Sequence, residues 1–154
     1  PTSILLITCS CNKKTFMKPD FDLALQKHFD AIANRDLNAF KAHLTQNETL
    51  YTIVQNGHAF TTPKEAITIH EEWFKDPSWI WEGSVVHKVV GQDMAMALVK
   101  YSYRANAKDT PFETWLTYVF ALEDGEWKIV HDQNTALDFS AFSKAMSQNS
   151  HSND

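Results

Sequence analysis

Hydrophobic and polar positions alternate with a period of two along most of the second half of the chain, a pattern typical of β-strands. We expect strands over residues 79–90, 94–104, 112–122 and 127–134, separated by short stretches rich in Gly, Asn and Asp. A β-branched and aromatic run predicts one earlier strand over residues 49–54. The pattern therefore predicts a sheet of long, mostly sequential strands.

The first part of the chain has helical spacing instead. Asp20 is an expected N-cap, and an apolar stripe with His28 on the same side follows it: Phe21, Leu25, Phe29 and Ile32. Residues 34–36 (Asn-Arg-Asp) should end this helix, and Asp36 should cap a shorter one that carries Leu37, Phe40 and Leu44. Two helices therefore precede the first strand.

A third helix has the clearest beginning. Thr62, Pro63 and Glu65 match a capping box with proline at the first helical position. This helix should run to about residue 75, with His70 on its apolar face and Trp73 adjacent. Helices followed by antiparallel strands give an α+β fold, in which a curved sheet wraps on the helices and encloses a cone-shaped cavity.

Residues 125–134, which hold the end of a turn and the last predicted strand, organise the rest of the sheet. Gly125 suits the left-handed residue of a turn with a G1 bulge, and that register puts Tyr118 on the same sheet face as Asp132 and Asn134. Trp127, Ile129 and His131 would then face away from the cavity. Because neither face is purely polar, we expect the outer face to be covered by a second copy in a homodimer, with Trp127 or Trp115 contributing.

Composition narrows the functional classes. The 154 residues carry a net charge of −5, have no basic block and contain no apolar run long enough for a transmembrane helix, so neither nucleic acid nor a transmembrane segment is expected. The seven histidines include no pair at metal-ligand spacing, and there is no nucleophile elbow, so we expect no metal and no cofactor.

The ends of the chain stand apart from the predicted domain. Residues 1–18 form a lead in which a short apolar run ends at Cys9 and Cys11, as in a bacterial lipoprotein signal, although the basic flank is missing. A packed N-terminal arm is the alternative, so both a periplasmic lipoprotein and a cytoplasmic protein stay open. The domain should span 19–136, and residues 137–154 should hold a short helix and a polar tail.

The order of these elements, with the segment Asp-Gly-Glu-Trp-Lys-Ile-Val-His at residues 124–131, resembles the nuclear transport factor 2-like superfamily. The likeness is greatest to SnoaL-like domains and to the association domain of calcium/calmodulin-dependent protein kinase II, and it covers about residues 21–135. It implies the ketosteroid isomerase-like cone fold. It does not imply one activity, because this fold hosts isomerases, cyclases, dehydratases, hydrolases and assembly domains.

The resemblance also implies positions for a site. The oxyanion donors of ketosteroid isomerases match His28 and Tyr118, but their general base falls near residues 52–54, where no carboxylate stands. The cavity arginines of the kinase association domain match Tyr101, Tyr118 and Asn134, and its third-helix histidine matches His70. The resemblance therefore implies a cavity at the same place in the fold, lined by aromatic hydroxyls and imidazoles in place of arginines.

From the residues themselves, a carboxylate on a covered sheet face must be paired or have a raised pKa, which singles out Asp132. The candidate catalytic residues are His28, Tyr118 and Asp132, and the candidate ligand-binding residues are His70, Trp73, Tyr101, Tyr103 and Asn134. Core packing is the alternative for the histidines, tyrosines and tryptophans, and an exposed strand end is the alternative for Asp132.

The expected function is binding of a small apolar molecule, with acid-base isomerase, cyclase or dehydratase chemistry on a carbonyl compound as one outcome. In that scheme His28 and Tyr118 donate hydrogen bonds to a developing oxyanion, and Asp132 or His70 moves the proton. The alternative is a non-catalytic dimerisation or ligand-sensing module, which the missing carboxylate at residues 52–54 favours.

Overall fold

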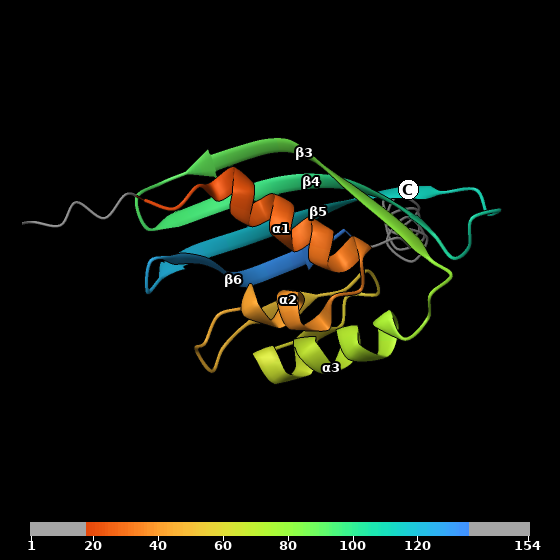
Figure 1. Ribbon diagram of the computed structural model, residues 1–154, viewed down its shortest axis with the longest axis horizontal. Coiled ribbons are helices and arrows are strands. Elements are labelled where there is room, and N and C mark those ends of the chain that lie inside the picture. Colours follow the sequence, from red (N-terminus) through yellow and green to blue (C-terminus); the bar gives the residue numbers. More distant parts are fainter. Residues whose placement is uncertain (1–17, 136–154) are drawn as a thin grey trace, which may run out of the picture.

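A computed structural model describes residues 18–135 as three helices and a six-stranded, curled, unclosed sheet (Figure 1). The helices are α1 (Phe21–Ala33), α2 (Leu37–Ala42) and α3 (Pro63–Phe74), and the strands are β1 (Tyr51–Ile53), β2 (Ala59–Phe60), β3 (Ile80–Val90), β4 (Met94–Arg104), β5 (Phe112–Glu123) and β6 (Glu126–Asn134). The sheet order is β2-β1-β6-β5-β4-β3. The α+β prediction is therefore confirmed. The short strand β2 was not foreseen, and β1 pairs with β6 in parallel while the other neighbours are antiparallel.

Local sequence signals set the helix ends. The Asp20 side chain accepts hydrogen bonds from the first turn of α1, and Thr62 and Glu65 form the predicted capping box of α3. Helix α1 ends in a Schellman motif, in which Arg35 has a positive φ of 57° and the amide of Asp36 donates to the carbonyl of Ala31 at 2.8 Å. This motif turns the chain sharply into α2.

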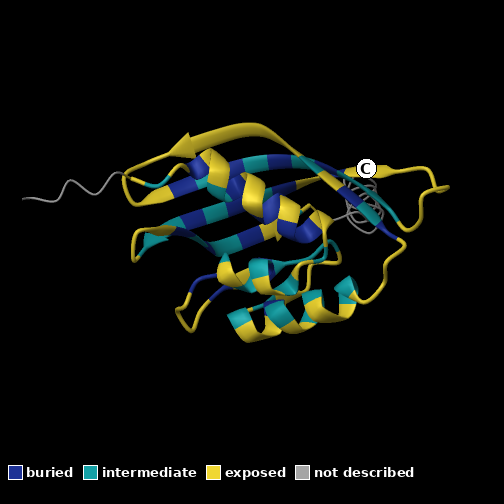
Figure 2. Cartoon of the chain, viewed as in Figure 1, coloured by how far each residue is buried: buried dark blue, intermediate teal, exposed yellow. Residues whose placement is uncertain are grey.

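Helix α1 crosses the concave face of the sheet, while α2 and α3 lie beyond β6 (Figure 1). Its apolar stripe is buried, and residues of β4 and β5 alternate between buried and more exposed positions (Figure 2). Two fully buried side chains, Leu25 on α1 and Phe120 on β5, belong to this core. Burial of an apolar side chain of this size contributes about 1.5–3 kcal/mol, so the packing of α1 on the sheet stabilises the fold.

The hairpin between β5 and β6 differs from the prediction. Its loop has only two residues, Asp124 and Gly125, which both have positive φ, as in a type I′ turn. The register shift lies inside β6, where Val119 pairs with His131 and Phe120 with Ile129, so that Val130 is the extra residue. The predicted bulge exists, but it lies in the strand and not at the turn.

The position of the bulge decides which side chains enter the core. Tyr118 pairs with Asp132 and so lies on the same sheet face, as predicted, because both residues lie beyond the bulge. Between the bulge and the turn the faces are reversed, so Trp127 and Ile129 are buried on the concave side, and the prediction that they face outward is wrong. The indole of Trp127 packs edge-on against Phe21 and donates to the carbonyl of Pro19 at 2.9 Å.

Several expectations concern residues outside this description. The lipoprotein-like lead with Cys9 and Cys11 and the terminal helix with Phe139, Phe142 and Met146 lie outside residues 18–135. Within the described part of the chain, no helix is long and apolar enough to cross a membrane.

Candidate functional site

A cavity of about 410 Å³ lies between the helices and the concave face of the sheet. All eight residues that the sequence singled out line it: His28 from α1, His70 and Trp73 from α3, Tyr101 and Tyr103 from β4, Tyr118 from β5, and Asp132 and Asn134 from β6. The rest of the lining is mostly apolar, and among the described residues it contains no lysine or arginine. A volume in this range accommodates a small organic molecule.

Asp132 is the one acidic side chain among these lining residues, and it is buried. Strands β1 and β6 pair Thr52 with Asp132, and the Thr52 hydroxyl donates to Asp132 Oδ2 at 2.9 Å. Burial raises the pKa of Asp132 to about 7, although the hydrogen bond from Thr52 acts in the opposite direction. The carboxyl group therefore changes charge near neutral pH.

Tyr118 lies on the other side of Asp132, as its partner in the antiparallel β5–β6 pair. Its ring meets His28 edge-on, with centroids 5.0 Å apart. Burial, followed by the charges of Asp132 and Tyr101, raises the pKa of Tyr118 well above its ordinary value. Tyr118 is therefore a phenol at physiological pH, able to donate its proton to a hydrogen bond.

A second polar group is formed by Tyr101, Asn134 and Gln55. The Tyr101 hydroxyl donates to Asn134 Oδ1 at 2.9 Å and accepts a hydrogen bond from Gln55 Nε2. Asn134 Nδ2 donates in turn to the carbonyl of Ile53 at 3.1 Å. These bonds fix the orientation of the amide and of the phenol, so this end of the cavity offers polar groups in defined positions.

His70 has a defined tautomer. Its Nδ1 lies 2.7 Å from the carbonyl oxygen of Ala66, which can only accept, so Nδ1 carries the proton. Burial lowers the pKa of His70 to about 4, and the ring stacks on Phe40 with centroids 4.0 Å apart. The neutral ring is thereby held in place and keeps Nε2 as an acceptor.

His28 is almost fully buried on α1, and its Nδ1 has no hydrogen-bond partner among residues 18–135. Burial is the main cause that lowers the pKa of His28 well below its ordinary value, and the nearby His43 and His70 lower it further. The ring is therefore neutral and carries one proton, which makes it a hydrogen-bond donor without a charge.

Aromatic packing shapes the remaining wall. Trp73 stacks on the buried Trp79 with ring centroids 4.3 Å apart. Arg35 also lies over the Trp79 ring, with its guanidinium carbon 3.9 Å from the ring centroid. Trp81 lies across Gly83, where a Cβ atom would be only 2.4 Å from Trp81 Cη2. The tryptophans therefore pack, as the sequence favoured, and Trp73 and Trp81 do so while lining the cavity.

Sequence reasoning missed three contributors. Thr52 was noted only as the place where a base is absent, although it binds Asp132 directly. Gln55 lies in a turn, where no periodicity marks a side chain as inward-facing. His43 follows the short helix α2 and packs against His28 with ring centroids 5.6 Å apart, a contact between elements that no local pattern records.

The chain combines a curled sheet, three helices and a cavity lined by polar and aromatic side chains, and it matches a known family. The model of the SnoaL-like domain matches residues 23–137. The chain belongs to the SnoaL-like domain family. None of the curated proteins compared with this SnoaL-like chain matches it.

Solved structures show the same fold. A protein from Thiobacillus denitrificans, provisionally named as a calcium/calmodulin-dependent protein kinase type II association domain, has a TM-score of 0.69 at 16% identity, over 78% of this chain and 97% of that one. A protein from Streptomyces avermitilis, provisionally named as a dehydratase of the NTF2-like family, has a TM-score of 0.65 at 12% identity, over 76% and 93%. An LEH-like epoxide hydrolase from M. tuberculosis has a TM-score of 0.57 at 13% identity, over 80% and 83%.

Proposed function

We propose that this SnoaL-like domain binds a small, neutral, mostly apolar carbonyl compound and moves a proton next to its carbonyl group. The observation that carries the proposal is the adjacent pair Tyr118 and Asp132, which are partners in the sheet and line the same cavity. One is a phenol donor and the other a carboxyl group whose pKa lies at about 7. Donor and base side by side are what enolisation of a ketone requires.

Asp132 takes the role of the base that the resemblance placed at residues 52–54. Because Thr52 and Asp132 are partners in the parallel pair, the carboxylate lies one strand away from the position where a base was expected. The Thr52 hydroxyl binds Oδ2, which leaves Oδ1 as the oxygen to accept a proton from carbon. A group with a pKa near the working pH serves well both as a base and, once protonated, as an acid.

The ligand oxygen would meet donors on the opposite side. Tyr118 donates its hydroxyl proton, and the neutral His28, whose ring lies edge-on to Tyr118, supplies the second donor. The aromatic side chains of Trp73, Trp81 and Tyr103 enclose the apolar body of the ligand. A permanently anionic ligand is disfavoured, since the described lining has no cation and holds a carboxyl group.

The comparisons agree with proton-transfer chemistry but do not fix a substrate. A provisional dehydratase and an epoxide hydrolase occur among proteins of this fold, and both names describe reactions in which protons move. A protein provisionally named as a calcium/calmodulin-dependent protein kinase type II association domain shares the fold too, and its name supports the alternative of a non-catalytic module.

The test is proton exchange into D₂O. One- and two-ring ketones with hydrogens next to the carbonyl are incubated with the protein, and NMR follows replacement of these hydrogens by deuterium. We expect exchange of at least one ketone, loss of exchange in Asp132→Asn, and retention of binding, which quenching of the Trp73 and Trp81 fluorescence reports. Binding without exchange would favour the ligand-sensing alternative, and neither binding nor exchange would refute the proposal.

A further inference from the structure

His28 and His43 lie between the cavity and a cleft at the surface. His28 lines the cavity, whereas His43 lines a separate cleft of about 220 Å³ at the surface of α1 and α2. The cleft is open to solvent, because most of its lining is exposed, including Lys27, Asp30 and Asp36. The two imidazoles lie edge to face, with centroids 5.6 Å apart and planes at 72°. The pair of rings therefore lies between the cleft and the cavity.

Both rings leave the same nitrogen unsatisfied. Within residues 18–135 only three buried side-chain nitrogens lack a hydrogen-bond partner, and two of them are Nδ1 of His28 and Nδ1 of His43. An isolated buried donor or acceptor costs about 1–3 kcal/mol, so two in adjacent rings call for an explanation. If one Nδ1 carries a proton and the other does not, one water molecule between the rings can satisfy both nitrogens.

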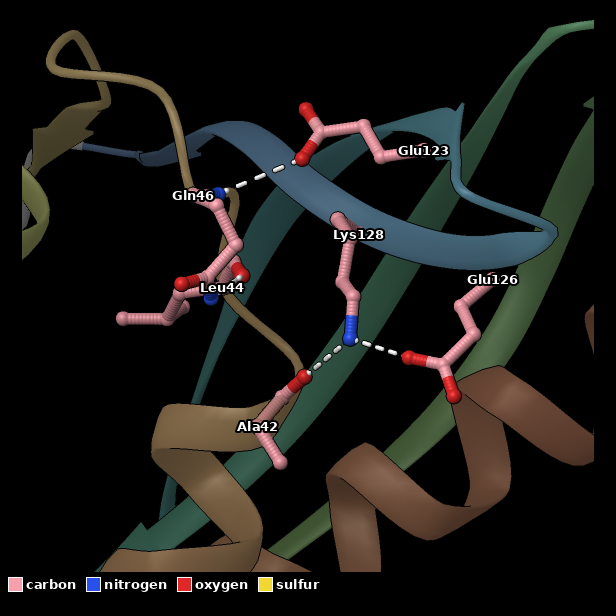
Figure 3. A network of polar contacts seen from close by, with 6 residues as sticks. All are labelled: Ala42, Leu44, Gln46, Glu123, Glu126 and Lys128. Carbon is pink, nitrogen blue, oxygen red and sulfur yellow. Dashed lines mark hydrogen bonds and ion pairs between the residues drawn. The ribbon is translucent and has the colours of Figure 1, made fainter.

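The contact is held by the backbone. The amide of Ile129 donates to the carbonyl of His43 at 2.8 Å, which ties this residue to β6. On either side of His43, Lys128 Nζ donates to the carbonyl of Ala42 at 2.7 Å, and the amide of Gln46 donates to Glu123 (Figure 3). Lys128 is itself paired with Glu126 (Figure 3). The segment between α2 and β1 therefore has little freedom to move His43 away from His28.

We propose that His43 and His28 form a proton relay that connects solvent in the surface cleft with the ligand oxygen in the cavity. The inference rests on the proposed function for the identity of the final acceptor. In it His28 donates to the ligand, and His43 replaces the proton that His28 gives up. His43 is thus a positioning and relay residue that does not itself touch the ligand.

The transfer balances without a co-reactant. His28 begins with its proton on Nε2, and His43 begins with its proton on Nδ1. As Asp132 takes a proton from carbon, His28 Nε2–H gives its proton to the ligand oxygen, and His43 Nδ1–H passes its proton through the bridging water to His28 Nδ1. His43 Nε2 takes a proton from water in the cleft, which leaves a hydroxide ion there. The system resets when Asp132 returns a proton to carbon, the ligand oxygen returns its proton to His28 Nε2, and the relay runs in reverse to neutralise the hydroxide ion. Each imidazole gains and loses one proton in each direction.

Burial, helped by nearby charges, lowers the pKa of both rings and so favours the neutral form that such a relay requires. Burial lowers the pKa of His43, and Lys128 and Lys27 lower it further, although Glu126 and Asp36 act in the opposite direction. Three titratable groups face His28: His43 from the segment after α2, His70 from α3 and Tyr118 from β5. A cationic imidazole would hold the proton instead of passing it on.

The test measures how fast the ring N–H of His28 exchanges with water, by solvent saturation transfer in protein labelled with ¹⁵N-histidine. We expect His43→Phe, which keeps a flat ring but removes both nitrogens, to slow this exchange at least tenfold. His58→Phe, at an exposed histidine next to β2, is the matched control and should leave the rate unchanged. Equal rates in wild type and His43→Phe would show that protons reach His28 through the cavity and would overturn the relay.

His43→Gln provides a second variant if the phenylalanine disturbs folding, because its amide cannot exchange protons between two nitrogens; it too should slow the exchange of His28. These measurements need no ligand, so they decide on the relay even if no ketone exchanges deuterium. If a ketone does exchange, His43→Phe should slow that reaction at least tenfold without weakening ketone binding. An unchanged rate of ketone exchange in His43→Phe would refute the relay but leave the proposed function in place.

Discussion

Asp132 lies directly opposite Thr52 in the parallel β1–β6 pair, and the threonine hydroxyl donates to its Oδ2 at 2.9 Å. This single hydrogen bond stabilises the ionised carboxylate and partly offsets the effect of burial, and the pKa of Asp132 is about 7 when both act. The balance between these two effects controls whether the cavity holds a charge at neutral pH.

Replacing Thr52 with Val should raise the pKa of Asp132 further, because the isosteric side chain keeps the packing but removes the donor. Proton exchange of a bound ketone should then require higher pH. The carboxyl ¹³C chemical shift of Asp132, followed against pH, measures the change directly. Thr45→Val is a control at another buried threonine that does not line the cavity. A pKa of Asp132 that stays at about 7 would contradict the role given to Thr52.

The raised pKa of Asp132 also predicts how stability depends on pH. The folded state binds this proton more tightly than the unfolded chain, whose carboxyl group has the ordinary value of 3.8. The carboxyl therefore has no cost below that value, and its cost grows as pH rises toward about 7 and is constant above it. Asp132→Asn, which resembles the protonated form, should be more stable than wild type at pH 8, by up to about 4 kcal/mol.

Urea denaturation at pH 4 and pH 8 measures this difference. The gain in the free energy of unfolding should disappear at pH 4, where the wild-type carboxyl is protonated in the folded state. Asp93→Asn, at an exposed turn, is the control and should give no such trend. A gain of the same size at both pH values would show that Asp132 is not buried as a titrating group.

Tyr118→Phe isolates the hydroxyl that is proposed to bind the ligand oxygen. The ring contacts with His28 and Phe120 are kept, so the free energy of unfolding should change little. A ketone that binds the wild type should lose about 1–3 kcal/mol of binding free energy, the cost of an unmade buried hydrogen bond. Fluorescence titration gives the affinity. Unchanged affinity in both Tyr118→Phe and His28→Gln would remove these residues from the site.

The sequence predicts the frame of this site better than its details. Helical stripes place His28 and His70 toward the core, and strand alternation places Tyr101 and Tyr103 on one face, because these patterns are local consequences of backbone geometry. The prediction that Tyr118 and Asp132 share a sheet face is confirmed, but its reason, a bulge at the turn, is wrong. One extra residue anywhere between Tyr118 and Asp132 in the chain gives this same pairing. The place of the extra residue decides which way Trp127 points, and it lies in β6 instead of at the turn.

Contacts between loops and distant elements produce no pattern in the sequence comparable to these stripes. Gln55 reaches Tyr101 from a turn, and His43 reaches His28 from the end of a short helix. Both contacts depend on how separate elements pack in three dimensions. Hydrophobic periodicity describes one element at a time, so it cannot predict them.

The two tryptophans of the predicted interface now separate into different roles. Trp127 is buried in the core against Phe21, whereas Trp115 is about 40% exposed on the outer face of β5. Other apolar side chains accompany Trp115 on that face, since the register places Val89, Met96 and Val119 on the side opposite the buried Ala97 and Tyr118. A homodimer formed through this face, as the sequence suggested, would therefore use Trp115 and not Trp127.

Two substitutions test this division. Trp127→Phe should lower the free energy of unfolding by about 1–3 kcal/mol, because it loses ring contacts and the hydrogen bond to Pro19, but it should not change the mass in solution. Trp115→Glu should leave the fold intact and convert a dimer to a monomer, since a charge in an apolar contact between copies is left unpaired. Light scattering at micromolar concentration reads the mass, and a monomeric wild type would refute the dimer while leaving the cavity and its chemistry untouched.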